Sequence, residues 1–379
     1  MGQFWLCLFF SMAVGTMVGL VTGESYDPTY FLHDILTYPI LAAISCIMVA
    51  GTDAAERLQS VADLVIWIGI FPLCIMLVVA LGGISVPSIN PWFWERFQGW
   101  SDNPNQLALM ALVLLLVALF RYETALTFGG RARAVLCLLL AAWVGRLSQS
   151  DSFTFAALTA GLVFCAMTMR AWMRSRESPT PVRTAAAWIG VVLLPAFLIS
   201  LAPSLLFSGN PIASAVTSLT KNGGKDANHE ADLRLGLWKA ALRRGFETGM
   251  LGLGPGPHLP MPSEIAADHV NAGREGLVNH PLQGAAANFE AHNTALDLFT
   301  EGGFLLVAAF ACLIGRALYG VFRAGNKSLT AMLWGLTVFG STGLICRHPL
   351  FWFAIAICLA ACDPASTEVR RRLTNYLPL

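Results

Sequence analysis

Residues 290–310 read EAHNTALDLFTEGGFLLVAAF, a polar stretch that becomes an apolar helix. His292 and Asn293 stand where the apolar run begins, and Glu301 lies inside it. An ionisable group is costly within a bilayer, so its presence at the mouth of a span is a reason to look for a functional site. A single histidine at a span boundary is often only an interfacial residue. The meaning of this stretch therefore depends on the rest of the chain.

The composition indicates a membrane protein. Of the 379 residues, 56% are hydrophobic and only 12% are charged, whereas soluble domains carry about 25% charged residues. Apolar runs of roughly 17–25 residues, long enough to cross a bilayer as helices, recur along most of the chain. The net charge is +1 and there is no basic arm. We therefore predict an all-α polytopic membrane protein that does not bind nucleic acid.

About ten transmembrane helices are expected, within a range of ten to twelve. The apolar runs lie at residues 4–22, 33–51, 61–82, 106–121, 133–147, 153–170, 185–207, 293–315, 329–346 and 349–362. The sequence CRHP interrupts the last two. The chain is thus divided into an N-terminal bundle of about seven spans (1–207), one long loop (208–292) and a C-terminal part of about three spans with a tail (293–379).

Basic residues predict the orientation. With a cytoplasmic N-terminus, the inner connections hold fourteen of the 24 Lys and Arg residues, and the short outer ones hold only Arg96, Arg146 and Arg347. Short cytoplasmic loops are rich in Lys and Arg. Both termini are therefore expected in the cytoplasm and the long loop outside it. All seven histidines then lie on or near the outer face.

The long loop contains a predicted amphipathic helix, DLRLGLWKAALRRG (232–245). Its apolar residues at helical spacing are Leu235, Trp238, Ala241 and Leu242. The simplest interpretation is a helix lying on the bilayer, with its basic residues Lys239, Arg243 and Arg244 at anionic headgroups. The GLGPG sequence at 252–256 follows no predicted strand, which argues against a nucleotide-binding loop.

Four histidines of the loop suggest a metal site at first sight. His258, His269, His280 and His292 are separated by 11, 11 and 12 residues, and 11 residues make about three helical turns. Three prolines interrupt any continuous helix through them: Pro260, Pro262 and Pro281. We therefore predict no metal site and no cofactor.

Arg146 and Arg347 stand at predicted membrane edges. Such arginines often extend their side chains to the lipid headgroups. The alternative is that they bind an anion that itself resides at the interface, such as a lipid diphosphate. The planar guanidinium presents a fork of donors that fits phosphate oxygens.

Four segments, in order, resemble the O-antigen ligase and O-antigen polymerase superfamily. HNTALDLFTEGG resembles its "HN…L…E.G" signature, and LRLGLWKAAL followed by GLGPG resembles its "R…W…G.G.G" block. Upstream, RFQGWSDNPNQLA resembles the "G…NPN.LA" loop and RLSQSDSF the "S.SR" segment. The resemblance covers roughly residues 85–320. The family's arginine after "S.S" is Asp151 here, while Arg146 stands five residues earlier.

This resemblance implies a GT-C-like membrane glycosyltransferase of the bacterial inner membrane, acting in O-antigen, lipopolysaccharide or exopolysaccharide assembly. The donor would be a glycan on polyprenyl (undecaprenyl) diphosphate, and the acceptor a hydroxyl of another glycan or of lipid A-core, on the periplasmic side. The implied catalytic residues are His292 as general base, Arg234 at the diphosphate, and Glu301. The implied substrate-binding residues are Arg146, Arg347, Arg96, Asn293 and Trp238.

Other functions remain open at this stage. The superfamily signature serves both ligases and polymerases, so it does not distinguish them. A transporter or flippase for a lipid-linked glycan would be expected to show inverted repeats and midplane charges. A noncatalytic scaffold would not need the histidines and arginines that gather on the outer face. We see no internal repeat, which favours the transferase.

Overall fold

The computed structural model describes residues 1–51, 54–82, 90–93, 96–101, 103–174, 223–262 and 289–361. These residues are almost all helical, and seven of the described helices are long and apolar enough to cross a membrane. The prediction of an all-α polytopic membrane protein is therefore confirmed. The chain forms two compact units, which are described separately below.

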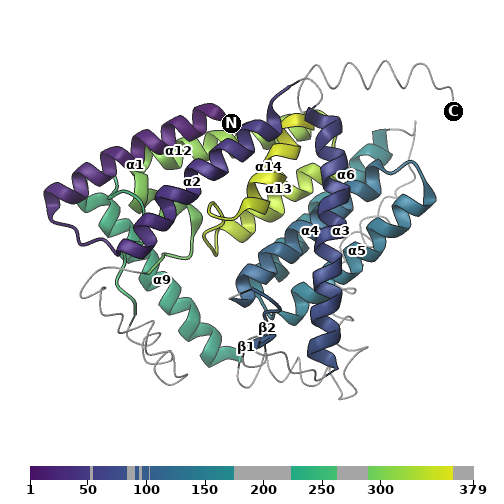
Figure 1. Cartoon of the computed structure of the whole chain (residues 1–379), viewed down its shortest axis with the longest axis horizontal. Helices are drawn as coiled ribbons and strands as arrows, with labels where there is room; N and C mark the ends of the chain where they lie inside the picture. Colours follow the sequence, from purple (N-terminus) through teal and green to yellow (C-terminus); the bar gives the residue numbers. More distant parts are fainter. Residues whose placement is uncertain are drawn as a thin grey trace. The chain divides into compact units, whose positions relative to one another are not determined.

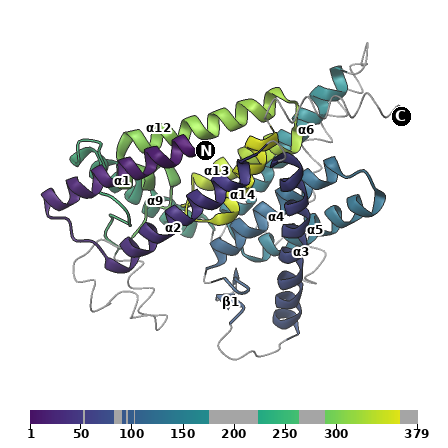
Figure 2. The ribbon, with the colours of Figure 1, turned by 45° about the horizontal axis from the view of Figure 1, so that its top comes forward.

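Unit 1 comprises residues 1–47, 212–314 and 340–349. Its helices are α1 (Gly2–Thr22), α2 (Pro28–Val49), α9 (Gly223–Glu247) and most of α12 (Thr294–Arg323). The first two helices and α12 lie side by side in Figures 1 and 2. Trp5 of α1 donates a hydrogen bond of 2.8 Å to Ser45 of α2. Where α1 passes α12, a Cβ on Gly15 would lie 2.7 Å from the carbonyl oxygen of Glu301, so only glycine fits.

The GLGPG segment is docked into a break in α12. Gly303 has φ 69° and ψ −167°, which interrupts the helix, and a Cβ there would lie 2.1 Å from the carbonyl oxygen of Met250. The interruption frees backbone groups that the segment then satisfies. Leu253 and Gly254 donate to the carbonyls of Thr300 and Glu301 at 2.8 and 2.7 Å. These amides are occupied by protein acceptors, which agrees with the argument against a nucleotide loop.

Unit 2 comprises residues 48–211, 315–339 and 350–379. Its described elements are α3 (Ala54–Leu81), β1 (Trp92–Phe93), β2 (Arg96–Phe97), α4 (Pro104–Thr124), α5 (Phe128–Leu147), α6 (Asp151–Arg174), α13 (Lys327–Gly340) and α14 (Pro349–Ala361). Most of α4 is buried, and α5 packs along it. The side chain of Asn103 caps α4 by accepting the Asn105 N–H at 2.8 Å. The two-residue strands form a small hairpin that the all-α prediction did not include.

Seven of the ten predicted spans correspond to helices long enough to cross a membrane. The predicted span 185–207 lies outside the described residues. The ninth predicted span, 329–346, is shorter than expected, because α13 ends at Gly340. The tenth, predicted at 349–362, corresponds to α14, which has 13 residues. Residues 341–348 separate them, and this segment contacts the start of α12 instead of extending a helix.

Candidate active site

His292 is held in an unusual backbone conformation. Its φ is +52°, in the left-handed region that costs a non-glycine residue about 1–3 kcal/mol. The carboxylate of Asp297 accepts the N–H groups on either side of it, from Ala291 at 2.6 Å and Asn293 at 3.2 Å. Asp297 is only 4% exposed. This buried carboxylate therefore fixes the loop that carries the histidine.

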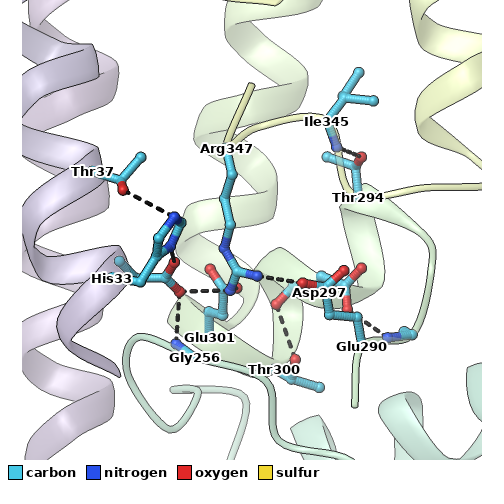
Figure 3. A network of polar contacts seen from close by, with 12 residues as sticks. His33, Thr37, Gly256, Glu290, Thr294, Asp297, Thr300, Glu301, Ile345 and Arg347 are labelled. Carbon is cyan, nitrogen blue, oxygen red and sulfur yellow. Dashed lines mark hydrogen bonds and ion pairs between the residues drawn. The ribbon is translucent and has the colours of Figure 1, made fainter. Parts of the chain in front are cut away.

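The segment 340–349 completes this loop from the other side. Asn293 caps α12 by accepting the Ala295 N–H at 3.1 Å, and its amide donates to the carbonyl of Ser341 at 2.9 Å. Thr294 donates to the carbonyl of Gly343 at 2.6 Å and accepts the Ile345 N–H at 3.2 Å (Figure 3). The start of α12 is thus tied to a segment about fifty residues later.

The surroundings of His292 favour its neutral form. The ring is half-buried and meets Phe289 edge to face, with centroids 5.1 Å apart. Burial lowers the pKa of His292 below its ordinary value of 6.5, the Glu290 carboxylate raises this pKa in part, and Arg234 lowers it again. A histidine with a lowered pKa is unprotonated near neutral pH. It is therefore able to accept a proton.

Helix α9 lies against the same loop. Leu237 and Ala241 of α9 are in a buried cluster with Leu259 and Ala291, beside the histidine. This face also brings Arg234 within electrostatic range of His292. The helix was predicted from the sequence. Of its predicted apolar face, Ala241 is buried together with Leu237, whereas Leu235 and Leu242 are 47% and 42% exposed.

Trp238 lies one helical turn from Arg234 and is half-buried. Its indole Nε1 is buried, and it has no hydrogen-bond partner within the part of the chain that the structure describes. Buried tryptophan N–H groups normally find an acceptor. A role for this donor in binding a substrate stays a prediction.

Arg347 is surrounded by carboxylates. Its Nη1 pairs with Glu290, and its Nη2 contacts Asp34 at 2.5 Å and Glu301 at 3.0 Å. Figure 3 shows the guanidinium near Glu301 and Glu290. Asp34, which is fully buried, also accepts the Gly256 N–H at 3.0 Å. A phosphate approaching the Nη atoms of Arg347 would have to compete with three carboxylates.

Glu301 is 1% exposed and shares this network. Its second oxygen accepts the hydroxyl of Tyr38 at 3.1 Å, while the first accepts Arg347. Glu301 is thus paired with an arginine inside the fold. Its catalytic role stays a prediction.

Arg96 and Arg146 belong to unit 2. Arg96 donates to the Ser148 carbonyl at 3.0 Å and to the Asn105 side chain at 2.8 Å, so it braces the turn that follows α5. Arg146 is exposed in the last turn of α5. Their role as diphosphate ligands stays a prediction.

The far end of α9 borders a cavity of about 420 Å³. Here Arg244 pairs with Glu24, and Arg243 pairs with Glu247 at 2.8 Å. Both arginines thus have protein carboxylates as partners, not only the headgroups that the simplest interpretation gave them. His258 is buried in the wall, and its Nε2 lies 2.8 Å from the Gly254 carbonyl. His269 and His280, the middle members of the histidine series, lie outside the described residues.

Sequence reasoning missed two acids of this site. Asp297 follows His292 by five residues, and a carboxylate in the first turn of a helix is a common feature that draws no attention. Asp34 lies in a predicted span, and its partner Arg347 is 313 residues away. The useful signal was the presence of a carboxylate inside an apolar run.

We expect Asp297→Ala to lower kcat on the order of 10²-fold with little change in the donor KM, because a small misplacement of a reacting group is costly. Without the carboxylate, the amides on either side of His292 lose the acceptor that holds the histidine at positive φ. Steady-state kinetics with purified protein would measure the change. The test of a positioning role is a double variant, since Asp297→Ala should add little to His292→Ala.

Thr300→Val is the matched control for this substitution. Thr300 is buried one turn later, and its hydroxyl donates only to the Asp297 backbone carbonyl, at 2.9 Å. We expect near-normal kinetics for it. If Asp297→Ala lowered kcat by the same factor in the wild type and in the His292→Ala variant, Asp297 would act on folding and not through the histidine.

Comparison with known proteins agrees with the resemblance seen in the sequence. Residues 134–311 match the family model described as O-antigen ligase. No curated protein matches the chain. The matched range includes most of α5, all of α6 and α9, the His292 loop and more than half of α12. The chain is therefore a multi-pass membrane protein, and its residues 134–311 are similar to the O-antigen ligase family.

Proposed function

We propose that the protein transfers a glycan from polyprenyl (undecaprenyl) diphosphate to an acceptor hydroxyl at the periplasmic face of the bacterial inner membrane. The acceptor is another glycan or lipid A-core. The observation that carries this proposal is the geometry of His292, a neutral imidazole fixed by Asp297 at the mouth of α12 with Arg234 nearby. Both termini are in the cytoplasm, and residues 208–292 form the periplasmic catalytic loop between two membrane parts, 1–207 and 293–379.

The proposed reaction is a displacement at the anomeric carbon of the donor sugar. The acceptor oxygen forms a bond to that carbon as the bond from carbon to the diphosphate oxygen breaks. The hydroxyl proton passes to His292, and polyprenyl diphosphate leaves with the electron pair. The donor already carries an activated leaving group, so the reaction needs no nucleotide.

Arg234 is our first choice for binding the departing diphosphate. A fixed guanidinium stabilises the negative charge that grows on the leaving group, so it helps the transition state more than the ground state. Its charge also acts on His292, which supports placing the two groups at one reaction centre. The Nε1 donor of Trp238, one turn away, is suited to a phosphate or sugar oxygen. Arg146 and Arg96 are the further proposed ligands of the donor.

Arg347 and Glu301 have an indirect role in this proposal. Their ion pair, together with Asp34, connects α2, α12 and the segment 340–349 around the His292 loop. Asn293 acts in the same way by capping α12 and contacting Ser341. We therefore assign Arg347 and Glu301 to positioning the catalytic loop, although the sequence suggested direct roles at the substrate.

Transfer should persist in EDTA, because the donor is pre-activated and the proposed cations are arginines. The test uses purified protein in vesicles that contain a polyprenyl-diphosphate glycan and a soluble acceptor, with glycan transfer measured directly. Loss of transfer that Mg²⁺ or Mn²⁺ restores would contradict the proposal. It would also return attention to the histidines of the long loop as metal ligands.

A further inference from the structure

A second cavity, of about 350 Å³, lies in unit 2 where α6 and α12 end. Arg170 of α6 and Arg323, the last residue of α12, both line it, and Tyr319, Phe322 and Gly325 complete the α12 side. In Figure 2 the end of α12 runs beside α6. None of the proposed catalytic residues takes part in this cavity.

Among the described residues, the cavity gathers positive charge without carboxylates. The guanidinium of Arg170 lies over the Phe322 ring, 4.8 Å from its centroid, and Arg323 donates to the Tyr319 hydroxyl at 3.3 Å. No acidic residue is among the described residues that line it. The cavity beside α9 differs in this respect, because Glu24 and Glu247 pair with its arginines. Two cations around one hollow therefore favour an anionic ligand.

The position of the cavity indicates what that anion is attached to. Helices α6 and α12 are both long and apolar enough to span the membrane. Arg323 is the last residue of α12, and Arg170 lies near the end of α6, which ends at Arg174. Tyr319 and Phe322, both on α12, are 63% and 42% exposed. Aromatic residues and the ends of arginine side chains concentrate at the headgroup level of a bilayer. The cavity is therefore expected at the height of lipid phosphates.

We propose that this cavity binds the phosphate diester of an anionic phospholipid, with Arg170 and Arg323 on the phosphate and the aromatic rims against the lipid. The guanidinium fork suits phosphate oxygens, and basic pockets between membrane helices bind anionic headgroups in this way. Each arginine also offsets the negative end of a helix dipole. If the arginines only offset the helix dipoles, they need no common cavity and no bound lipid. Only the lipid-binding proposal predicts that replacing either arginine weakens lipid binding.

The test is native mass spectrometry of the purified full chain in detergent, titrated with short-chain phosphatidylglycerol, phosphatidylcholine or inorganic phosphate. We expect phosphatidylglycerol to bind more tightly than phosphatidylcholine. Arg323→Gln, at an exposed position, should weaken phosphatidylglycerol binding about tenfold or more, and Arg170→Gln should do the same, since each removes a charge-assisted contact. Inorganic phosphate should bind far more weakly than the lipid.

Arg316→Gln is the matched control. Arg316 is an exposed arginine of the same helix, two turns before Arg323, and it does not line the cavity. It should bind phosphatidylglycerol as the wild type does. The proposal is overturned if Arg316→Gln and Arg323→Gln lose lipid equally, if phosphatidylcholine binds as tightly as phosphatidylglycerol, or if inorganic phosphate binds as well as the lipid. Because glycan transfer is not the readout, failure here is distinct from failure of the proposed transferase function.

Discussion

His292→Ala is expected to lower the rate of glycan transfer about 10²–10⁴-fold, the usual contribution of a general base. The donor should still bind, because Arg234 and Trp238 remain. Rapid-mixing assays of a single turnover would give the rate of transfer, and a separate titration would give the donor affinity. Near-normal turnover in His292→Ala would mean that this histidine is only an interfacial residue.

The pH dependence of the wild type should report the same group. A base has to be unprotonated to act, and burial lowers the pKa of His292. Activity should therefore fall as the pH drops through a value below 6.5, and this acid limb should be absent from the residual activity of His292→Ala. His269→Ala and His280→Ala are suitable controls from the same loop. His258 is less suitable, because it is buried against Gly254.

Arg234→Ala is expected to weaken donor binding by about 10–100-fold, the effect of removing one charged partner of a phosphate. Turnover of the bound donor should fall as well, because the leaving group loses a fixed cation. Arg234→Lys should recover only part of the donor affinity and part of the turnover, since an ammonium keeps the charge without the forked donors of a guanidinium. Donor affinity and single-turnover rates measured side by side would separate these effects.

Arg243→Ala provides the control for Arg234. Arg243 is on the same helix, its side chain is 82% exposed, and its partner is Glu247. We expect the Arg243→Ala variant to bind the donor with the affinity of the wild type. If Arg234→Ala bound the donor normally while transfer was lost, the arginine would act on His292 and not on the diphosphate.

Features that depend on local composition could be predicted from the sequence. The apolar runs gave the positions of α1 to α6 and α12, because a membrane helix is specified by about twenty consecutive residues. The helical periodicity of residues 232–245 gave α9. His292 drew attention because a titratable ring stands directly before an apolar run.

Features that depend on distant partners could not be predicted. The docking of GLGPG into the break at Gly303 requires two segments fifty residues apart, and glycine in a membrane helix is too common to indicate a break by itself. The same holds for Arg347, whose carboxylate partners include Asp34 in α2. At a membrane edge an arginine is equally consistent with binding a phosphate, a headgroup or a carboxylate. Only the fold distinguishes these.

The most direct test of the central claim is to follow a doubly labelled polyprenyl-diphosphate glycan, with one label on the lipid and one on the glycan, in vesicles containing the purified protein. We predict that the wild type releases polyprenyl diphosphate in step with glycan joined to the acceptor, and that His292→Ala binds the donor but leaves both labels on one molecule. Movement of the intact donor across the bilayer without cleavage, equally in the wild type and in His292→Ala, would contradict this account and indicate a flippase.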